Sequence, residues 1–382
     1  MRSDTTIPVC LLKTLLLRQR AFLLVLRDVT RELASITFAI LFPLVFAGFM
    51  APQLAAQALP SDEIKPVPLL SGGVGFITTI DGGDPHLGPI VSPVILLPLG
   101  KRWLFEARGN FESDLVQVPG ENGFHGTVAK SVDYAQLDFV VNRYVTLTAG
   151  RFLTPFNIYN ERLYPVWIRD LQTDPLILPI GIGPSNASNG GMVRGGFQAH
   201  PSFDVNYAVY FSALTTTTAI DSSRLVGGRA GIFVPKTRLE FGGSFQYSLQ
   251  DEHSSSFGFY AVWEPYALPL EVRGEYARSI QGSGYWGEAD YRLSQLPFWR
   301  KQMRHTQAVA RMQQFFVSAS SADSLYPSNM KMFEFGLNYY FIDGFRAASS
   351  YGRQFSVDGN SNLWTVGLTY RFVIPLGHAG RN

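Results

Sequence analysis

The sequence between about residues 71 and 373 repeats one pattern, a stretch of alternating polarity followed by turn residues. The pattern is clearest at residues 238–250, where even positions are polar or glycine and odd positions, apart from Gly243, are apolar or aromatic. A period of two places the two sets on opposite faces of a β-strand. Such a stretch is long for a soluble protein but suits a tilted strand that crosses a membrane. The pattern predicts an all-β, antiparallel transmembrane β-barrel with a polar interior and an apolar exterior.

The composition is compatible with a barrel. Hydrophobic residues make up 46% of the 382 residues, which would also fit a soluble protein, because only alternate residues of a barrel strand face lipid. The 29 Phe, 17 Tyr and 6 Trp residues can supply the aromatic girdles of such a barrel. A net charge of +2 argues against a nucleic-acid partner. Cys10 is the single cysteine, so no disulfide framework is expected.

The N-terminal segment has the features of an export signal. Arg27 and Arg31 precede an apolar run at 33–49, and an A-x-A cleavage signal follows at 56–58. We therefore expect residues 1–58 to be a targeting segment and residues 59–382 to form the barrel. The alternative is a transmembrane anchor, although a run of this length lies at the lower limit for a membrane span.

Sixteen strands are predicted, with about 14 or 18 as alternatives. The second strand has the weakest pattern, because Pro93 and Pro98 would interrupt its hydrogen-bond ladder. The predicted strands are 71–80, 90–98, 102–114, 130–141, 144–152, 191–199, 203–213, 224–234, 238–250, 255–264, 269–280, 284–293, 305–317, 330–341, 345–356 and 362–373.

Short and long connections alternate between these strands, as they do when periplasmic turns lie at one rim of a barrel and external loops at the other. Short turns are predicted at 99–101, 142–143, 201, 236 and 343–344. Long loops are predicted at 81–89, 115–129, 153–190, 214–223 and 318–329. The strands and connections account for the whole mature chain, so no plug domain is expected. A soluble β-sandwich would explain neither the loop asymmetry nor the export signal.

Strand parity assigns the charged residues to the lumen, because a charge on the lipid face would cost about 2–4 kcal/mol at the membrane midplane. The inward basic residues are Arg108, Arg194, Arg238, Arg273, Arg292, Arg311, Arg346 and Arg371. The inward acidic residues are Glu106, Glu112, Asp114, Asp138, Asp204, Glu240, Glu271, Glu275, Glu288, Asp290 and Glu334. This mixed wall lacks the arginine and lysine excess that a strong anion filter requires.

The loop at 153–190 is long and apolar, and such a segment is costly to leave in water. Sixteen strands also enclose a channel too wide to filter small solutes. We therefore expect the loop to fold into the barrel, with Glu161, Arg162, Arg169 and Asp170 as candidates for a constriction. The alternative is a loop that folds outward as a cap or partner surface.

The block Ala149-Gly150-Arg151-Phe152-Leu153-Thr154-Pro155-Phe156, followed by Tyr159-Asn160-Glu161-Arg162, resembles the phosphate-selective porin O and P family. The resemblance is specific only over about residues 149–196. It implies a Gram-negative outer-membrane channel, often trimeric, for small hydrophilic or anionic solutes. The mixed wall departs from this pattern, and ten residues follow the terminal aromatic signature at 370–372.

Catalytic motifs are absent from the sequence: it contains no H-E-x-x-H, G-x-S-x-G or phosphate-binding glycine loop. No cofactor or metal site is expected. The favoured function is a weakly selective porin that is integral to the bacterial outer membrane and contacts its lipid, with a homotrimer as a possible assembly. Two alternatives stay open: an outer-membrane hydrolase, for which His305 and the serines at 318–321 could pair, and a non-conducting surface barrel.

Overall fold

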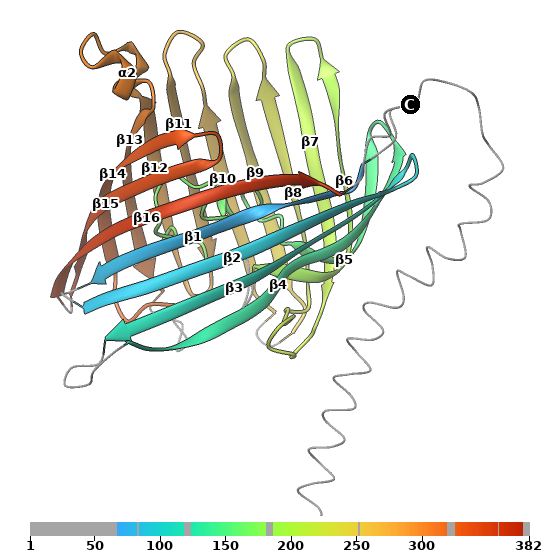
Figure 1. The fold of residues 1–382 in the computed structure, drawn as a ribbon. Coiled ribbons are helices and arrows are strands. Elements are labelled where there is room, and N and C mark those ends of the chain that lie inside the picture. The colour runs from blue at the N-terminus through green and yellow to red at the C-terminus, as the bar shows by residue number, and fades with distance from the viewer. Residues whose placement is uncertain are drawn as a thin grey trace, which may run out of the picture. The chain divides into compact units, whose positions relative to one another are not determined.

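The computed structural model describes residues 67–81, 84–117, 124–180, 186–250, 253–318, 325–357 and 359–376. They form a closed barrel of sixteen strands, in which each strand pairs antiparallel with the next and the first pairs with the last (Figure 1). The predicted fold class and strand number are confirmed, and no plug domain lies among the described residues. The proposed targeting segment, 1–58, lies outside them.

The strands follow one another around the barrel in chain order. They are β1 (Leu69–Asp81), β2 (Asp84–Leu99), β3 (Trp103–Gln117), β4 (Phe124–Asn142), β5 (Val145–Leu153), β6 (Ala187–His200), β7 (Phe203–Ala213), β8 (Leu225–Val234), β9 (Leu239–Ser248), β10 (Ser255–Trp263), β11 (Leu270–Ser279), β12 (Gly282–Arg292), β13 (Thr306–Val317), β14 (Met330–Ile342), β15 (Phe345–Ser356) and β16 (Gly359–Pro375).

The predicted bounds agree with these strands to within four residues except at the starts of β2 and β4, which each begin six residues earlier than predicted. The predicted long loop at 81–89 is therefore wrong. Residues 84–89 instead pair with β1, from Asp81 opposite Asp84 to Phe76 opposite Pro89. Pro85, Gly88 and Pro89 gave this segment the composition of a loop, but pairing with a neighbouring strand outweighs that local preference.

The prolines of β2 affect one side of its ladder. Pairing with β1 is continuous, whereas pairing with β3 skips residues 88–89 and 92–93, which include Pro89 and Pro93. Proline has no N–H group to donate, so a ladder hydrogen bond is lost at each position. The expected weakness of this strand is thus confined to its β3 edge.

A β-bulge in β4 changes which residues face inward. Arg108 of β3 lies opposite Tyr134 and Gly109 lies opposite Val132, so Asp133 is the extra residue. Asp133 is buried and accepts a hydrogen bond of 2.7 Å from Nε of Arg108. Simple parity missed Asp133 because a bulge shifts the alternation by one residue.

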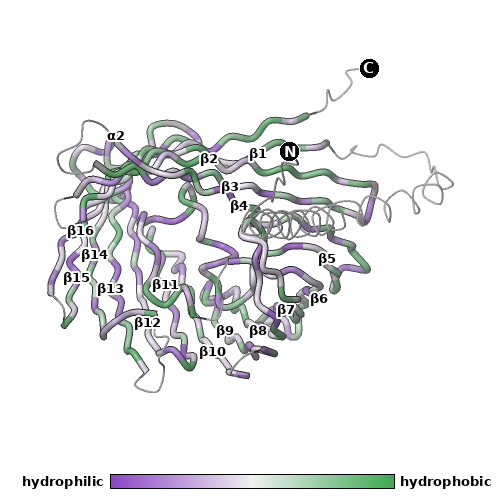
Figure 2. The backbone as a smooth tube through the Cα atoms, turned by 90° about the horizontal axis from the view of Figure 1, so that it is seen from below, coloured by the Kyte–Doolittle hydropathy of each residue, from purple (hydrophilic) through white to green (hydrophobic). Residues whose placement is uncertain are grey.

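The alternation of polarity along the strands is clear in β14. Phe333, Phe335 and Leu337 are exposed on the outer face, whereas Glu334 and Asn338 are buried on the inner face. Figure 2 shows the same alternation between hydrophilic and hydrophobic residues along many strands. Among the described residues, no helix is long and apolar enough to cross a membrane.

Candidate functional site

The connection between β5 and β6, residues 154–186, carries all four predicted constriction residues and is called the inner loop below. The loop turns sharply at Asn157, which has a left-handed φ of 53°, a conformation that asparagine tolerates better than most residues. A π-helical turn, η1 (Tyr159–Leu163), follows. The side chains of this loop pack against inward-facing residues of β8, β9 and β11–β15.

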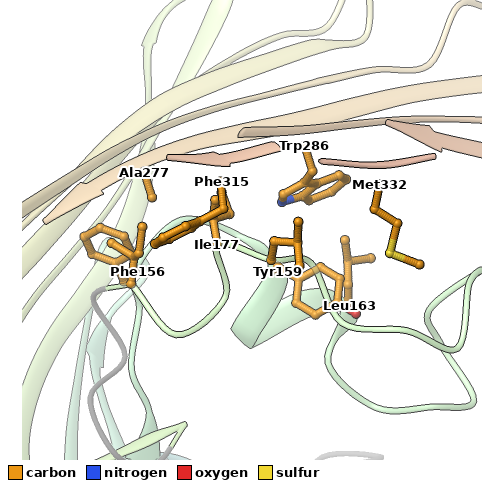
Figure 3. Close-up of a cluster of buried hydrophobic side chains, with 10 residues drawn as sticks. Phe156, Tyr159, Leu163, Ile177, Ala277, Trp286, Phe315 and Met332 are labelled. Atoms are coloured by element: carbon orange, nitrogen blue, oxygen red, sulfur yellow. The ribbon is translucent and has the colours of Figure 1, made fainter. Parts of the chain in front are cut away.

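Apolar packing holds one side of the inner loop to the wall. Phe156, Tyr159 and Ile177 of the loop face Trp286 of β12 and Phe315 of β13, as Figure 3 shows. The cluster is completed by Leu163, Leu176, Ile180, Ala277 and Met332. Each large apolar side chain buried in this way contributes about 1.5–3 kcal/mol relative to exposure in water. The barrel therefore has a hydrophobic core inside its lumen, between the inner loop and strands β11–β14.

Glycines in the wall make room for the inner loop. A Cβ atom at Gly73 of β1 would overlap the indole ring of Trp167, and one at Gly336 of β14 would overlap Leu171. These glycines let loop side chains lie directly on the strand backbone. The contacts at β1 and β14 extend the attachment of the loop beyond the apolar cluster.

Glu275 of β11 binds the backbone at the start of η1. Its Oε1 accepts hydrogen bonds of 2.8 Å from the backbone N–H groups of Ile158 and Tyr159. Its Oε2 accepts a bond of 3.1 Å from Nε1 of Trp286. A buried carboxylate with three donors satisfies amide groups that would otherwise lack partners at the start of the turn.

The four candidate constriction residues do not face one another across an open channel. Glu161 pairs with Arg229 of β8, and Arg162 pairs with Glu240 of β9 at 2.7 Å. These loop charges are bound to the nearby wall.

The other two candidates lie further along the loop. Asp170 pairs with Arg273 of β11 at 2.5 Å, whereas Arg169 pairs with Asp174 inside the loop itself. Tyr159 also donates a hydrogen bond of 3.2 Å to Asp174. Burial raises the pKa of Tyr159, so this phenol stays neutral and keeps its proton for that bond.

Three further wall residues bind the loop backbone or its hydroxyl groups. Arg346 of β15 donates to the carbonyls of Val166 at 2.6 Å and Arg169 at 2.7 Å. Arg311 of β13 donates to the carbonyl of Thr173 at 2.8 Å, and Glu334 of β14 accepts from the hydroxyl of Thr173. Most predicted wall charges on β11–β15 are therefore used to hold the loop.

The charges on β3–β6 form a separate group. Asp138 of β4 accepts hydrogen bonds from Thr148 at 2.5 Å and from Arg194 of β6 at 2.7 Å. Glu106 and Glu112 of β3 are in no ion pair within the described part of the chain, and Glu112 is exposed. Among the described residues, this part of the wall therefore presents carboxylates that no arginine neutralises, and that of Glu112 is exposed to water.

Three predicted wall residues lie at the ends of strands or in an adjacent turn. Arg238 is not the first residue of β9 as predicted; it lies in the preceding turn with a left-handed φ of 51° and pairs with Glu264. Arg371 is exposed near the end of β16. Glu271 at the start of β11 pairs with Arg273 at 2.8 Å.

Sequence reasoning missed Arg229, which binds both Glu161 and, at 2.8 Å, the carbonyl of Asn157. Its strand has glycine at residues 227, 228 and 231, so polarity barely alternates there. The high cost of a charge facing lipid was a usable signal, since it requires any strand arginine at membrane depth to face inward.

Three carboxylates lie close enough together to hold a metal ion. Those of Asp170, Glu288 and Asp290 have oxygens within 4.8 Å of one another. Arg273 donates to both Asp170 and Glu288, each at 2.5 Å, and Arg311 donates to Glu288 at 2.7 Å. Guanidinium groups therefore already occupy the positions from which a cation would neutralise two of these three carboxylates.

Solved structures share the architecture at low sequence identity. OmpF of Salmonella typhi is 10% identical with a TM-score of 0.54, and the match covers 80% of this chain and 97% of that one. OprB of Pseudomonas putida is 9% identical with a TM-score of 0.52, covering 80% and 91%. An anion-selective porin from Comamonas acidovorans is 11% identical with a TM-score of 0.51, covering 80% and 99%.

These likenesses establish the fold alone, which is that of the integral β-barrels of the outer membrane, and of porins in particular. No protein-family model and no curated protein sequence matches the chain. The specific resemblance to the phosphate-selective porin O and P family therefore gains no support from these comparisons.

Proposed function

We propose that the chain is a porin of a Gram-negative outer membrane, through which small hydrophilic solutes and ions diffuse passively. The observation that carries the proposal is the inner loop, which is attached to inward-facing side chains of β8, β9, β11 and β13–β15. A sixteen-stranded barrel encloses an aqueous channel, and a loop fixed inside it narrows that channel. Arg162, Ile168 and Asp174 remain exposed on the loop, which suits a narrowed rather than a filled lumen.

Weak ion selectivity is the second part of the proposal. Arg162, Arg229 and Arg273 each bind a carboxylate, so they present little unbalanced positive charge to a permeating anion. Glu106 and Glu112 of β3 form no ion pair with any residue that the structure describes. Selectivity in pores follows the charges that line the path, so a small preference for cations is expected. Strong phosphate selectivity, which the family resemblance would imply, is not part of this proposal.

A channel is favoured over the hydrolase alternative by the position of His305. His305 precedes β13 and Ser318 follows it, so the full length of that strand separates the two residues. Twelve strand residues span roughly 40 Å at about 3.4 Å each. A nucleophile and its base must lie within hydrogen-bond reach, so these two residues cannot act together in one barrel. Ser320 and Ser321 lie outside the described residues.

Planar-bilayer recording on the purified mature protein tests the proposal. We expect discrete conductance steps in KCl. In a tenfold KCl gradient, the reversal potential should have the cation sign and stay below about a third of the ~59 mV limit for perfect selectivity. Absence of steps would support the non-conducting barrel, and a strong anion preference would contradict the assignment of the arginines. Cross-linking in the native membrane tests the homotrimer separately.

A further inference from the structure

A cavity of about 280 Å³ lies between the inner loop and strands β8–β11. It lies beside the short connections at 235–238 and 264–269, so it adjoins the short-turn rim of the barrel. Its volume is near the lower end of the range of about 300–1,000 Å³ that is usual for small-molecule sites. The cavity can therefore hold only a small solute.

The charged lining of the cavity consists of three arginines and three glutamates that form three ion pairs. Arg162 pairs with Glu240 at 2.7 Å, and Arg273 pairs with Glu271 at 2.8 Å. The third pair joins Arg238 and Glu264. The cavity has no net charge, so it offers neither a cation nor an anion an unbalanced attraction.

The three pairs differ in their access to water. The side chains of Arg238 and Glu264 are each 41% exposed, whereas that of Arg273 is 5% exposed. An exposed ion pair contributes at most about 1 kcal/mol, so its two groups can exchange partners at little cost. A solute that carries both a carboxylate and an ammonium group could bind Arg238 and Glu264 together, leaving neither charge without a partner.

Apolar residues also line this cavity, where the inner face of a barrel is ordinarily polar. Phe233 of β8 and Val262 of β10 have the inward parity of Arg229 and Tyr260 on the same strands. Neither is buried, although Ile158 of the loop is 1% exposed. Contact with the loop therefore leaves apolar surface of Phe233 and Val262 available to a solute.

We propose that this cavity is a binding site for zwitterionic solutes with an aliphatic group, the chemistry of a neutral α-amino acid. The carboxylate of the solute binds Arg238, its ammonium binds Glu264, and its aliphatic group contacts Phe233 and Val262. The inference rests on the proposed channel, because the site lies along its lumen. It adds a solute class that neither the sequence nor the fold assigns.

Current block by four small solutes tests the site in bilayer recordings at neutral pH. L-leucine carries both charges and an aliphatic group, 4-methylpentanoate lacks the ammonium, 3-methylbutylamine lacks the carboxylate, and glycine lacks the aliphatic group. We expect leucine to reduce the KCl current at a concentration about tenfold lower than any of the other three, because each of them loses one set of contacts. Equal potency of the four solutes would overturn the proposed binding site without contradicting the proposed channel.

The double variant Arg238→Gln/Glu264→Gln removes both charges in turns outside the strands. Block by leucine, scaled to the KCl conductance of the same variant, should weaken about tenfold. Arg143→Gln is the matched control, since Arg143 is in a short turn at the same rim and does not line the cavity. Loss of leucine block in the control as well would contradict the site.

Absence of conductance would refute the channel rather than the site. In that case, calorimetric titration of leucine into the detergent-solubilised barrel decides between the outcomes. Binding that is weakened in the double variant and not in Arg143→Gln supports the site. No binding to the unaltered protein overturns it.

Discussion

Arg162 of the inner loop and Glu240 of β9 form a two-pronged ion pair. Nη1 of Arg162 donates to Oε2 of Glu240 at 2.8 Å, and Nη2 donates to Oε1 at 2.7 Å. Tyr260 also donates a hydrogen bond of 3.2 Å to Oε1 of Glu240. This bond helps to hold the carboxylate in the orientation that accepts both bonds from Arg162. The hydrogen bonds that Arg162 donates to Glu240 raise the pKa of Arg162, so its charge persists at every accessible pH. The pair ties the loop to the wall and balances an arginine that would otherwise attract anions.

Replacing Glu240 with glutamine should release Arg162 and shift selectivity. The ion pair is partly exposed, so we expect a loss of only about 1 kcal/mol in loop attachment. The reversal potential in a KCl gradient should move toward the anion side, and open-channel current noise should rise. The charge-swapped variant Arg162→Glu/Glu240→Arg restores the pair and should return both quantities toward their original values. An unchanged reversal potential in Glu240→Gln would mean that Arg162 lies off the ion path.

Deleting the central part of the inner loop, Tyr159 to Leu178, should widen the channel. Leu153 and Ala187 are paired neighbours at the loop ends, so the remaining residues can close the gap. The barrel should still form, because its strand ladders do not include the deleted segment. We expect single-channel conductance to rise roughly twofold or more, since the barrel alone encloses a wide channel. Circular dichroism and heat-modifiable gel mobility verify assembly; unchanged conductance in an assembled deletion would contradict a constricting role for the loop.

A valine at Gly73 should expel Trp167 from the wall of β1. The added side chain would overlap the indole, and such overpacking typically costs about 1–3 kcal/mol. We expect a lower midpoint of urea unfolding and faster tryptic cleavage of the inner loop, for instance after Arg162. Gly287→Val is the control, because a Cβ atom there meets no atom within 4 Å. A further Trp167→Ala substitution should partly rescue Gly73→Val, and failure of that rescue would place the strain elsewhere.

The N-terminal export signal remains a prediction. The apolar run at 33–49 and the A-x-A signal at 56–58 lead us to expect cleavage after Ala58. N-terminal sequencing of protein isolated from outer membranes should begin at Leu59. Recovery of a chain that retains residues 33–49 would support the membrane-anchor alternative.

Polarity alternation was sufficient to predict the barrel because a membrane makes it nearly obligatory. Every strand must present apolar side chains to lipid, so the period of two recurs along most of the chain. Where glycine or proline weakens the alternation, the prediction loses accuracy. Residues 84–89 have the composition of a loop but pair with β1, and the glycine-rich strand of Arg229 does not reveal its inward direction by alternation.

The sequence by itself determined the strand number, the short turns and the inward parity of most charged residues, since these depend on neighbours within one strand. Only the tertiary structure decided what the charges do. The ion pair of Arg162 with Glu240 joins residues 78 positions apart. The packing of the Trp167 indole on Gly73 joins the loop to the first strand. Such contacts depend on how the loop packs across the closed barrel. The polarity of neighbouring residues does not predict that packing, because many wall residues have the same charge and the same inward parity.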